Sequence, residues 1–274
     1  MALTVRTNTT AMSAANQLNN TQNALAGSLN RISTGLRITS AADDAAGLGV
    51  ATNLSVQNSS LEQAMRNSND GISIIQTAEG ASNEVVNILD RMRELAVQSS
   101  SETLANTERA YIQDEYDELS SEVARIAAVT EFNGINISDG STTSIAVQVG
   151  IQNASSSQVS ITLGDLTTTT LGVGALTMSS STGALSSINR IDSALDTVNA
   201  YRSDLGSVQN RLDSSLANTS TYLESITSAA GNIMDADFAH ETSEMTKNQI
   251  MQQAGVAALS QAKNMSQSVI SLLS

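Results

Sequence analysis

The sequence predicts a mainly α-helical protein, built as a long antiparallel helical rod in two tiers. One tier is a coiled coil of the terminal helices, and the other is an inner helical bundle with a small β-hairpin region in the middle of the chain. Aromatic residues make up only 2% of the 274 residues, so smaller apolar side chains must form the contacts, which suits narrow helix–helix seams. Apolar residues recur at spacings of three and four over most of the chain, and a period-two pattern is confined to one central region.

The first predicted helix covers residues 1–33, and its pattern is interrupted over residues 34–46. Its apolar positions follow the heptad period and are Leu18, Leu25, Leu29, Ile32 and Leu36. The interrupting stretch is polar and contains the first acidic residues of the chain, Asp43 and Asp44. We therefore expect a linker at residues 34–46 between two helical segments.

Residues 47–185 are predicted to hold two further helices, a β-hairpin and a short variable loop. The second helix runs over about 45–99, and the triplet Asn69-Asp70-Gly71 is a weak point in an otherwise continuous helix. The third helix runs over about 104–129. Its seam steps regularly by fours and threes through Ile112, Tyr116, Leu119, Val123 and Ile126.

The central region changes character after Phe132-Asn133-Gly134, where Gly, Ser and Thr become frequent. Apolar residues alternate with period two in two runs, first Ile145, Val147, Val149 and Ile151, then Val159, Ile161 and Leu163. The polar run QNASSSQ separates them, which predicts a β-hairpin with a longish loop. The TTTTLGVGALTMSSSTG tract predicts a loop or a short irregular lobe.

Helical periodicity returns over residues 186–230, and a break is predicted at Ala230-Gly231-Asn232. The last segment, residues 231–274, is again helical, with an apolar seam that includes Met265, Val269 and Leu272. The simplest packing pairs the first helix with the last, so that both termini lie at one end. Isolated helices with seams of this kind are marginally stable, so we expect them to fray until neighbours supply the missing surface.

The charge distribution argues against nucleic acid and against catalysis. The net charge is −14, which opposes binding to phosphates. Residues 43–237 carry 25 acids and 8 bases, whereas residues 1–42 carry three arginines and no acid. No run approaches the length of a membrane-spanning helix, and the N-terminus lacks the pattern of a cleaved signal peptide. Few charges on the terminal helices indicate that much of their surface meets protein.

Reactive groups are scarce. There is no Cys, and His240 is the single His, so metal, cofactor and nucleophile schemes have no residue set to join. Asp43 and Asp44 could form a paired-carboxylate site, but adjacent helical residues point apart. Helix capping, or pairing with Arg31 or Arg37 of the same or a neighbouring subunit, is the simpler interpretation. We therefore expect a protein that is not an enzyme and needs no cofactor.

Five motifs, taken in order, resemble the bacterial flagellin family, the subunits of the flagellar filament. They are LNRISTGLRITSAADDAAGLGVA at 29–51, RMRELAVQSS at 91–100, RAYIQDEYDEL at 109–119, FNGINISDG at 132–140 and ALSQAKNMSQSVISLLS at the C-terminus. The match covers about residues 1–150 and 185–274. The departure is the middle, where many flagellins carry large outer domains and this chain has about fifty residues, which implies a minimal flagellin.

The resemblance implies roles for particular residues. Residues 1–33 and 231–274 would be inner-core helices, and residues 47–185 and 186–230 would form the outer tube. The linker and assembly residues would be Arg31, Gly35, Arg37, Asp43 and Asp44, with Gly35 allowing the backbone to leave helical geometry. The inner-core packing residues would be Leu18, Leu25, Leu29, Ile32, Met265, Val269 and Leu272. A surface recognised by vertebrate Toll-like receptors would include Arg91, Leu95 and Glu115.

The resemblance also implies partners and a location. The chain would form a helical homopolymer outside the cell, exported by the flagellar type III route without a cleaved signal peptide. The export apparatus, a filament cap and a chaperone that binds the C-terminal helix would be its other partners, without nucleic acid or membrane. A hook–filament junction protein shares the terminal helices, and a soluble coiled-coil signalling or adhesin stalk is a further alternative.

Overall fold

The computed structural model describes the backbone of residues 7–273 and the side chains of residues 7–264. The described chain is mainly helical, with α1 (Thr9–Thr34), α2 (Ala45–Ser100), α3 (Asn106–Val129), α4 (Ser181–Met234) and α5 (Phe238–Leu273). It divides into two compact units. Unit 1 holds residues 1–57 and 225–274, and unit 2 holds residues 58–224, so α2 and α4 each contribute to both. The predicted mainly α-helical class is confirmed.

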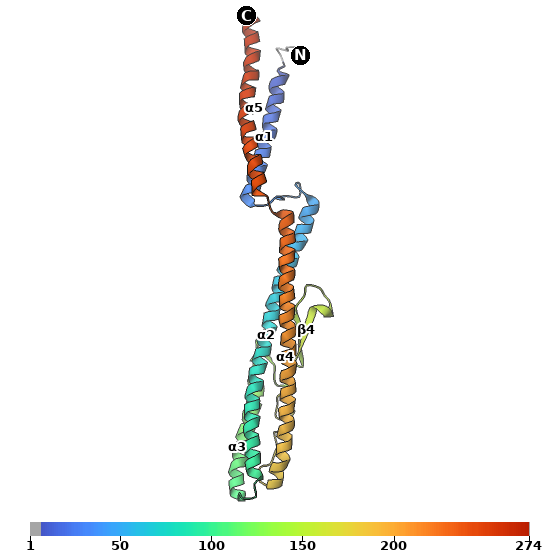
Figure 1. Cartoon of the computed structure of the whole chain (residues 1–274), viewed down its shortest axis with the longest axis vertical. Coiled ribbons are helices and arrows are strands. Elements are labelled where there is room, and N and C mark those ends of the chain that lie inside the picture. The colour runs from blue at the N-terminus through green and yellow to red at the C-terminus, as the bar shows by residue number, and fades with distance from the viewer. Residues whose placement is uncertain (1–6, 274) are drawn as a thin grey trace. The chain divides into compact units, whose positions relative to one another are not determined.

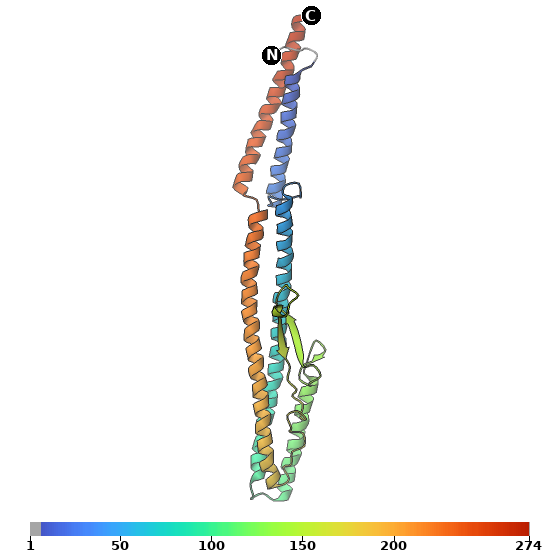
Figure 2. The ribbon, with the colours of Figure 1, turned by 90° about the vertical axis from the view of Figure 1, so that its right-hand side faces the viewer.

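Unit 1 contains α1 and α5, which lie side by side in both views (Figures 1 and 2). The pair is antiparallel, because the start of α1 contacts the far part of α5 and the end of α1 contacts the start of α5. Asn8 Nδ2 donates to the carbonyl of Ala262 at 3.0 Å, and Arg31 Nη1 lies 3.1 Å from Glu241 Oε1. The predicted pairing of the first helix with the last is confirmed.

Unit 2 is built on α2, α3 and α4, with α2 antiparallel to the other two. Arg91 of α2 contacts Glu115 of α3, and Arg93 of α2 contacts Asp192 of α4. The predicted seam residues Ile112, Tyr116 and Val123 of α3 lie in its apolar core, together with Val85, Leu89 and Met92 of α2. The regular spacing of three and four therefore identified the buried face of α3.

Two antiparallel hairpins follow α3. The predicted one pairs β3 (Ser144–Gln148) with β4 (Gln158–Thr162), and its register sets Ile145 opposite Ile161 and Val147 opposite Val159. A short 3₁₀ turn, η1 (Ser155–Ser157), precedes β4. A smaller hairpin pairs β1 (Glu131–Phe132) with β2 (Ile135–Asn136) and was not predicted. Its turn residues Asn133 and Gly134 both have positive φ, as a two-residue turn of this kind requires.

The hairpin of β3 and β4 packs against α2 and α4, as Figures 1 and 2 show. At Gly71, a Cβ atom would lie 3.0 Å from Val147 of the hairpin and 3.3 Å from Leu212 of α4. Asn67 also donates to the carbonyl of Gln148 at 3.1 Å. Helix α2 is continuous through the predicted weak point, and Gly71 serves the close approach of the hairpin there.

Residues 163–180, which we call the strap, are part of the bundle core and do not form a separate lobe. Their apolar side chains are buried, namely Leu163, Leu166, Leu171, Val173 and Met178. Tyr116 Oη donates to the carbonyl of Val173 at 2.7 Å, and Gln113 Nε2 donates to that of Leu176 at 3.2 Å. Burial raises the pKa of Tyr116 far above its usual range. The alternation of small polar and apolar residues concealed this packing from the sequence.

Helix α4 extends beyond the predicted break at Ala230-Gly231-Asn232 and ends at Met234. Glycine inside a helix costs only about 1 kcal/mol relative to alanine, so Gly231 does not have to end it. The break lies at residues 235–237 instead. The position of this break follows from the pairing of Asp235 with Leu36 of the linker at residues 34–46, which the local sequence does not reveal.

Candidate assembly interface

The seam that joins α1 to α5 is made largely of small and polar side chains. The buried residues on the two facing sides are Thr21 and Ser28 of α1 and Glu241 and Asn248 of α5. The helices approach closely where Gly255 meets Leu18, because a Cβ atom at Gly255 would lie 3.3 Å from Leu18 Cδ1. The pair therefore buries little apolar area within one chain.

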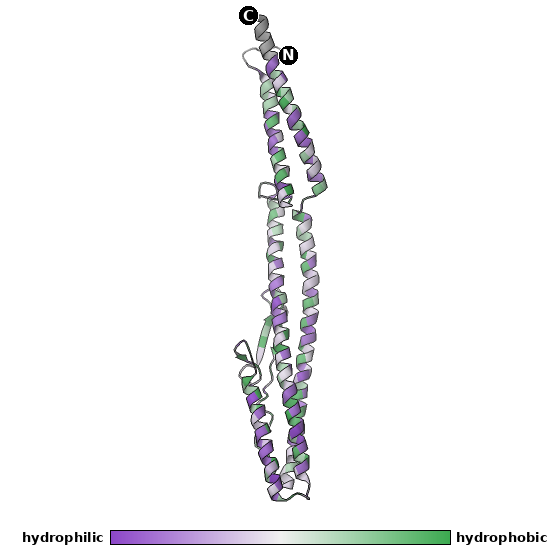
Figure 3. Ribbon diagram, turned by 90° about the vertical axis from the view of Figure 1, so that its left-hand side faces the viewer, coloured by the Kyte–Doolittle hydropathy of each residue, from purple (hydrophilic) through white to green (hydrophobic). Residues whose placement is uncertain are grey.

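Larger apolar side chains of the same two helices are exposed instead. They are Met12, Leu29, Phe238, Ile250, Met251 and Val256. Figure 3 shows hydrophobic and hydrophilic residues alternating along the visible faces of both helices. Ile250 keeps 62% of its surface exposed and Leu29 keeps 47%. An exposed apolar set on a helix pair with a polar seam is typical of a surface that another protein covers.

The predicted inner-core packing residues fall on different sides of α1. Leu18, Leu25 and Ile32 are half-buried, whereas Leu29 is exposed. The side chains of Met265, Val269 and Leu272 lie outside the described residues. Packing of all seven between copies stays a prediction.

The two linkers of unit 1 pair with one another through the backbone. Gly35 ends α1 in the left-handed conformation with a φ of 72°, and its N–H donates to the carbonyl of Arg31 at 2.8 Å. Leu36 then forms an antiparallel bridge with Asp235. Arg37 N donates to Met234 O at 2.6 Å, and Ala236 N donates to Gly35 O at 2.9 Å.

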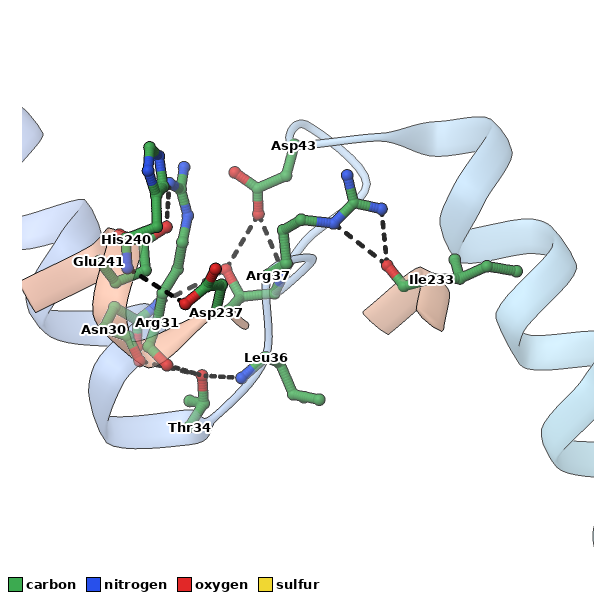
Figure 4. A network of polar contacts seen from close by, with 11 residues as sticks. Asn30, Arg31, Thr34, Leu36, Arg37, Asp43, Ile233, Asp237, His240 and Glu241 are labelled. Carbon is green, nitrogen blue, oxygen red and sulfur yellow. Dashed lines mark hydrogen bonds and ion pairs between the residues drawn. The ribbon is translucent and has the colours of Figure 1, made fainter. Parts of the chain in front are cut away.

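Arg37 also closes the end of α4. Its Nε and Nη2 atoms donate to the carbonyl of Ile233 at 3.2 and 2.7 Å (Figure 4). The last carbonyls of a helix have no partner inside the helix and carry its negative dipole end, so a guanidinium there is stabilising. The side chain of Arg37 thus fixes residues 34–46 to the end of a helix far away in sequence.

Asp43 and Asp44 have different roles, which corrects the prediction that both cap the next helix. Asp44 Oδ1 accepts from the backbone N–H of Gly47 at 2.8 Å and caps α2. Asp43 Oδ2 accepts from the backbone and hydroxyl groups of Thr39 and Ser40, and so folds the linker itself. The hydrogen bonds from Thr39, followed by those from Ser40, lower the pKa of Asp43. Within the described chain the side chains of Arg31 and Arg37 pair with Glu241 and Ile233 and not with these aspartates.

Two residues of this region were missed from the sequence. Ile38 is buried and packs against Gly47, where a Cβ atom would lie 2.8 Å from Ile38 Cδ1. Glu241 is buried although it is charged. The only local signal for Glu241 was its place near the start of a helix, which cannot distinguish a buried carboxylate from an exposed one.

The predicted receptor surface lies in unit 2, on α2 and α3. Arg91 Nη2 lies 2.7 Å from Glu115 Oε1, and Arg91 Nη1 lies 2.9 Å from Glu94 Oε2. Both glutamates raise the pKa of Arg91, Glu115 most strongly. Leu95 is only 1% exposed, so it packs beneath this surface and is not accessible in the folded chain. The prediction that Leu95 belongs to a receptor surface stays a prediction, with Leu95 beneath the accessible Arg91 and Glu115 in the folded chain.

The described residues contain no group of three or more His, Cys, Asp or Glu side chains placed to hold a metal ion. None of the described helices is long and apolar enough to cross a membrane. His240 is exposed, and its backbone N–H donates to Asp237 Oδ1 at 3.1 Å.

The fold defines a mainly helical protein whose terminal helix pair exposes large apolar side chains. Residues 5–143 match the bacterial flagellin N-terminal helical region, and residues 188–273 match the bacterial flagellin C-terminal helical region. The chain belongs to the bacterial flagellin family and is a subunit of the flagellar filament. The subunit polymerises with copies of itself.

Individual relatives agree with this assignment. A flagellin of Halalkalibacterium halodurans is 41% identical over 89% of this chain and 90% of its own length. The crystal structure of Bacillus cereus flagellin matches 56% of this chain and 88% of that chain, with 32% identity and a TM-score of 0.50. A putative flagellar hook-associated protein from Vibrio parahaemolyticus has a TM-score of 0.60 over 70% of this chain and 100% of that chain. At 15% identity it shows a shared fold alone.

Proposed function

We propose that the filament grows because the exposed apolar residues of α1 and α5 are buried against identical copies. The observation that carries this proposal is the contrast between the polar seam inside the chain and the apolar residues outside it. Burying one Leu, Ile, Val or Met side chain fully contributes roughly 1.5–3 kcal/mol. Several such residues per chain offset the entropy of ordering two long helices, which one chain alone cannot do.

In this proposal residues 1–33 and 231–274 are the inner-core helices, residues 34–46 are the linker, and residues 47–185 and 186–230 are the outer part. Met265, Val269 and Leu272 are proposed, from the sequence pattern, to pack between copies as well. Contacts between copies are head-to-tail, so they do not close on themselves and a helical filament grows.

The Ile250→Asp substitution tests this assembly surface. A charge at a position buried between copies costs several kcal/mol, so we expect the critical concentration for polymerisation to rise by about a hundredfold or more. Sedimentation of seeded filaments measures it. Ile250→Leu, the control, should stay within about threefold of the native chain because it keeps the apolar volume. Normal polymerisation of the Asp variant would contradict the proposal.

We also propose that the chain acts outside the cell and leaves it through the flagellar type III export apparatus. Before export, a cytoplasmic chaperone covers the C-terminal helix, whose exposed apolar residues would otherwise aggregate. After export, a filament cap receives the chain at the tip. Shearing of intact cells tests the location. Recovery of the protein only from the cytoplasm would contradict it.

The Arg91–Glu115 surface is proposed to be recognised by a vertebrate Toll-like receptor. Arginine is enriched among the residues that dominate binding, so Arg91→Ala is expected to lower the signalling potency of the unpolymerised chain by about tenfold or more. A receptor-reporter cell line measures this potency. Arg125→Ala removes an exposed arginine of α3 that pairs with Glu122, and it serves as the matched control. Equal potency of the two variants would contradict the proposal.

A further inference from the structure

Helix α1 carries a single charged side chain over its whole length, Arg31, in its last turn. Arg31 Nη1 lies 3.1 Å from Glu241 Oε1 of α5, and the side chain of Glu241 is only 7% exposed. The second oxygen, Glu241 Oε2, is buried and has no hydrogen-bond partner within the described residues. Among the residues that the structure describes, Arg31 is therefore the one cation paired with this buried carboxylate.

The bridge between Leu36 and Asp235 fixes the linker end of the helix pair. Beyond that end, the rest of the seam discriminates poorly between alternative alignments. Thr21, Ser28 and Asn248 are small or polar, and Gly255 offers no side chain at the close approach to Leu18. Asn8 hydrogen-bonds to a backbone carbonyl of α5, a group that every turn of a helix presents. Sliding α5 by one heptad would keep the same face toward α1.

Such a slide would move Glu241 about 10 Å along α1, given a rise of 1.5 Å per residue. A slide toward the start of α1 would set the carboxylate against a stretch without any cation, because Arg31 is the only charge on that helix, and a slide the other way would carry it past the end of α1. Removing one partner of a buried pair is strongly destabilising, and setting alignment is the best-attested role of buried polar groups in coiled coils. We propose that the Arg31–Glu241 pair carries the alignment of the linker bridge at Leu36 and Asp235 into the register in which α1 pairs with α5, and that the exposed apolar faces are aligned for assembly through it. The second part rests on the proposed function.

The chain contains no Cys, so an engineered pair can report the register without interference. A Cβ atom at Gly255 would lie 4.0 Å from Leu18 Cβ, which is within the range for a disulfide. The test introduces Leu18→Cys with Gly255→Cys and measures the yield of intrachain disulfide under mild oxidation. Both unpolymerised chains and filaments are assayed, so the register is read whether or not polymerisation occurs.

The double-Cys chain is expected to crosslink efficiently. Adding Arg31→Glu or Glu241→Arg should lower the yield of intrachain disulfide at least about threefold. The variant that combines both changes should give a yield about threefold higher than the lower-yielding single variant. Recovery should remain incomplete, because the exchanged charges oppose the dipoles of α1 and α5 at their ends. Glu241→Gln, which keeps the shape and removes the charge, should give an intermediate yield.

Three outcomes would overturn the proposal. They are unchanged yields in both single variants, no recovery in the exchanged variant, and crosslinked dimers in place of intrachain bonds. Exchange of the exposed Glu122–Arg125 pair on α3 is the matched control and should leave the yield unchanged. A loss there equal to that of Arg31→Glu would mark a general charge effect and would also overturn it. Failure of the proposed assembly surface would give a different result. The crosslinking yields would follow the expected pattern, but the Ile250→Asp variant would still polymerise normally.

Discussion

Deleting residues 238–274 is expected to abolish polymerisation while leaving unit 2 folded. The deletion removes α5 entirely, so the half-buried residues Leu18, Leu25 and Ile32 of α1 lose their neighbour within the chain. The apolar core of unit 2 spans residues 74–212 and includes nothing from the deleted segment. The critical concentration should rise beyond about a thousandfold, since the cost of several lost apolar contacts exceeds 4 kcal/mol.

Sedimentation and electron microscopy of seeded solutions measure the loss, and urea unfolding followed by circular dichroism checks unit 2. The matched control shortens the exposed hairpin loop by removing residues 152–154, which should leave the urea midpoint nearly unchanged. Filaments of normal length from the truncated chain would refute the assembly mechanism. Loss of the cooperative unfolding transition would refute the independence of unit 2.

Replacing Arg109 by Met is expected to lower the free energy of unfolding of unit 2 by about 3 kcal/mol. Arg109 is 7% exposed, and its guanidinium donates to the carbonyls of Ser99 at 3.0 Å and Ser101 at 2.7 Å. These carbonyls lie at the C-terminal end of α2, where no helical partner exists. Ser99 in turn donates to the carbonyl of Met178, and Ser181 donates to that of Ser100, so one guanidinium supports the junction of α2, the strap and α4.

Urea unfolding of the unpolymerised chain measures this effect. Arg109→Lys should recover little, because an ammonium cannot reproduce the planar fork that reaches two carbonyls at once. Arg125→Met serves as the control, because Arg125 lies in an exposed pair with Glu122, and it should change the free energy by less than about 0.5 kcal/mol. Equal effects of the two Met variants would show that the carbonyl contacts of Arg109 contribute nothing.

The sequence predicted those parts of the fold in which side-chain period alone decides burial. Ile112, Tyr116 and Val123 are buried as their spacing requires, and Val147 lies opposite Val159 as period-two alternation predicts. The same reasoning placed Leu29 in the α1 seam, whereas Ser28 is buried there. Hydrophobic periodicity finds an apolar face, but it cannot tell whether that face meets the same chain or another one.

Long-range hydrogen bonds explain the remaining differences. The position of the second linker depends on the bridge between Leu36 and Asp235, and the burial of Glu241 depends on Arg31. Asp43 accepts hydrogen bonds from Thr39 and Ser40, which precede it in the chain, whereas helix-capping rules consider only the residues that follow. Each of these partners is chosen by tertiary geometry, which one sequence read by local rules does not contain.

The buried strap limits where this protein can acquire new sequence. Leu166, Val173 and Met178 are fixed in the core at short intervals, so an added segment between them would pull at least one from its site. The turn between β3 and β4 has no such anchor, since residues 151–156 are all exposed. A displayed peptide, a label or an evolutionary insertion is therefore well accommodated at that turn, because the chain can lengthen there without disturbing the bundle.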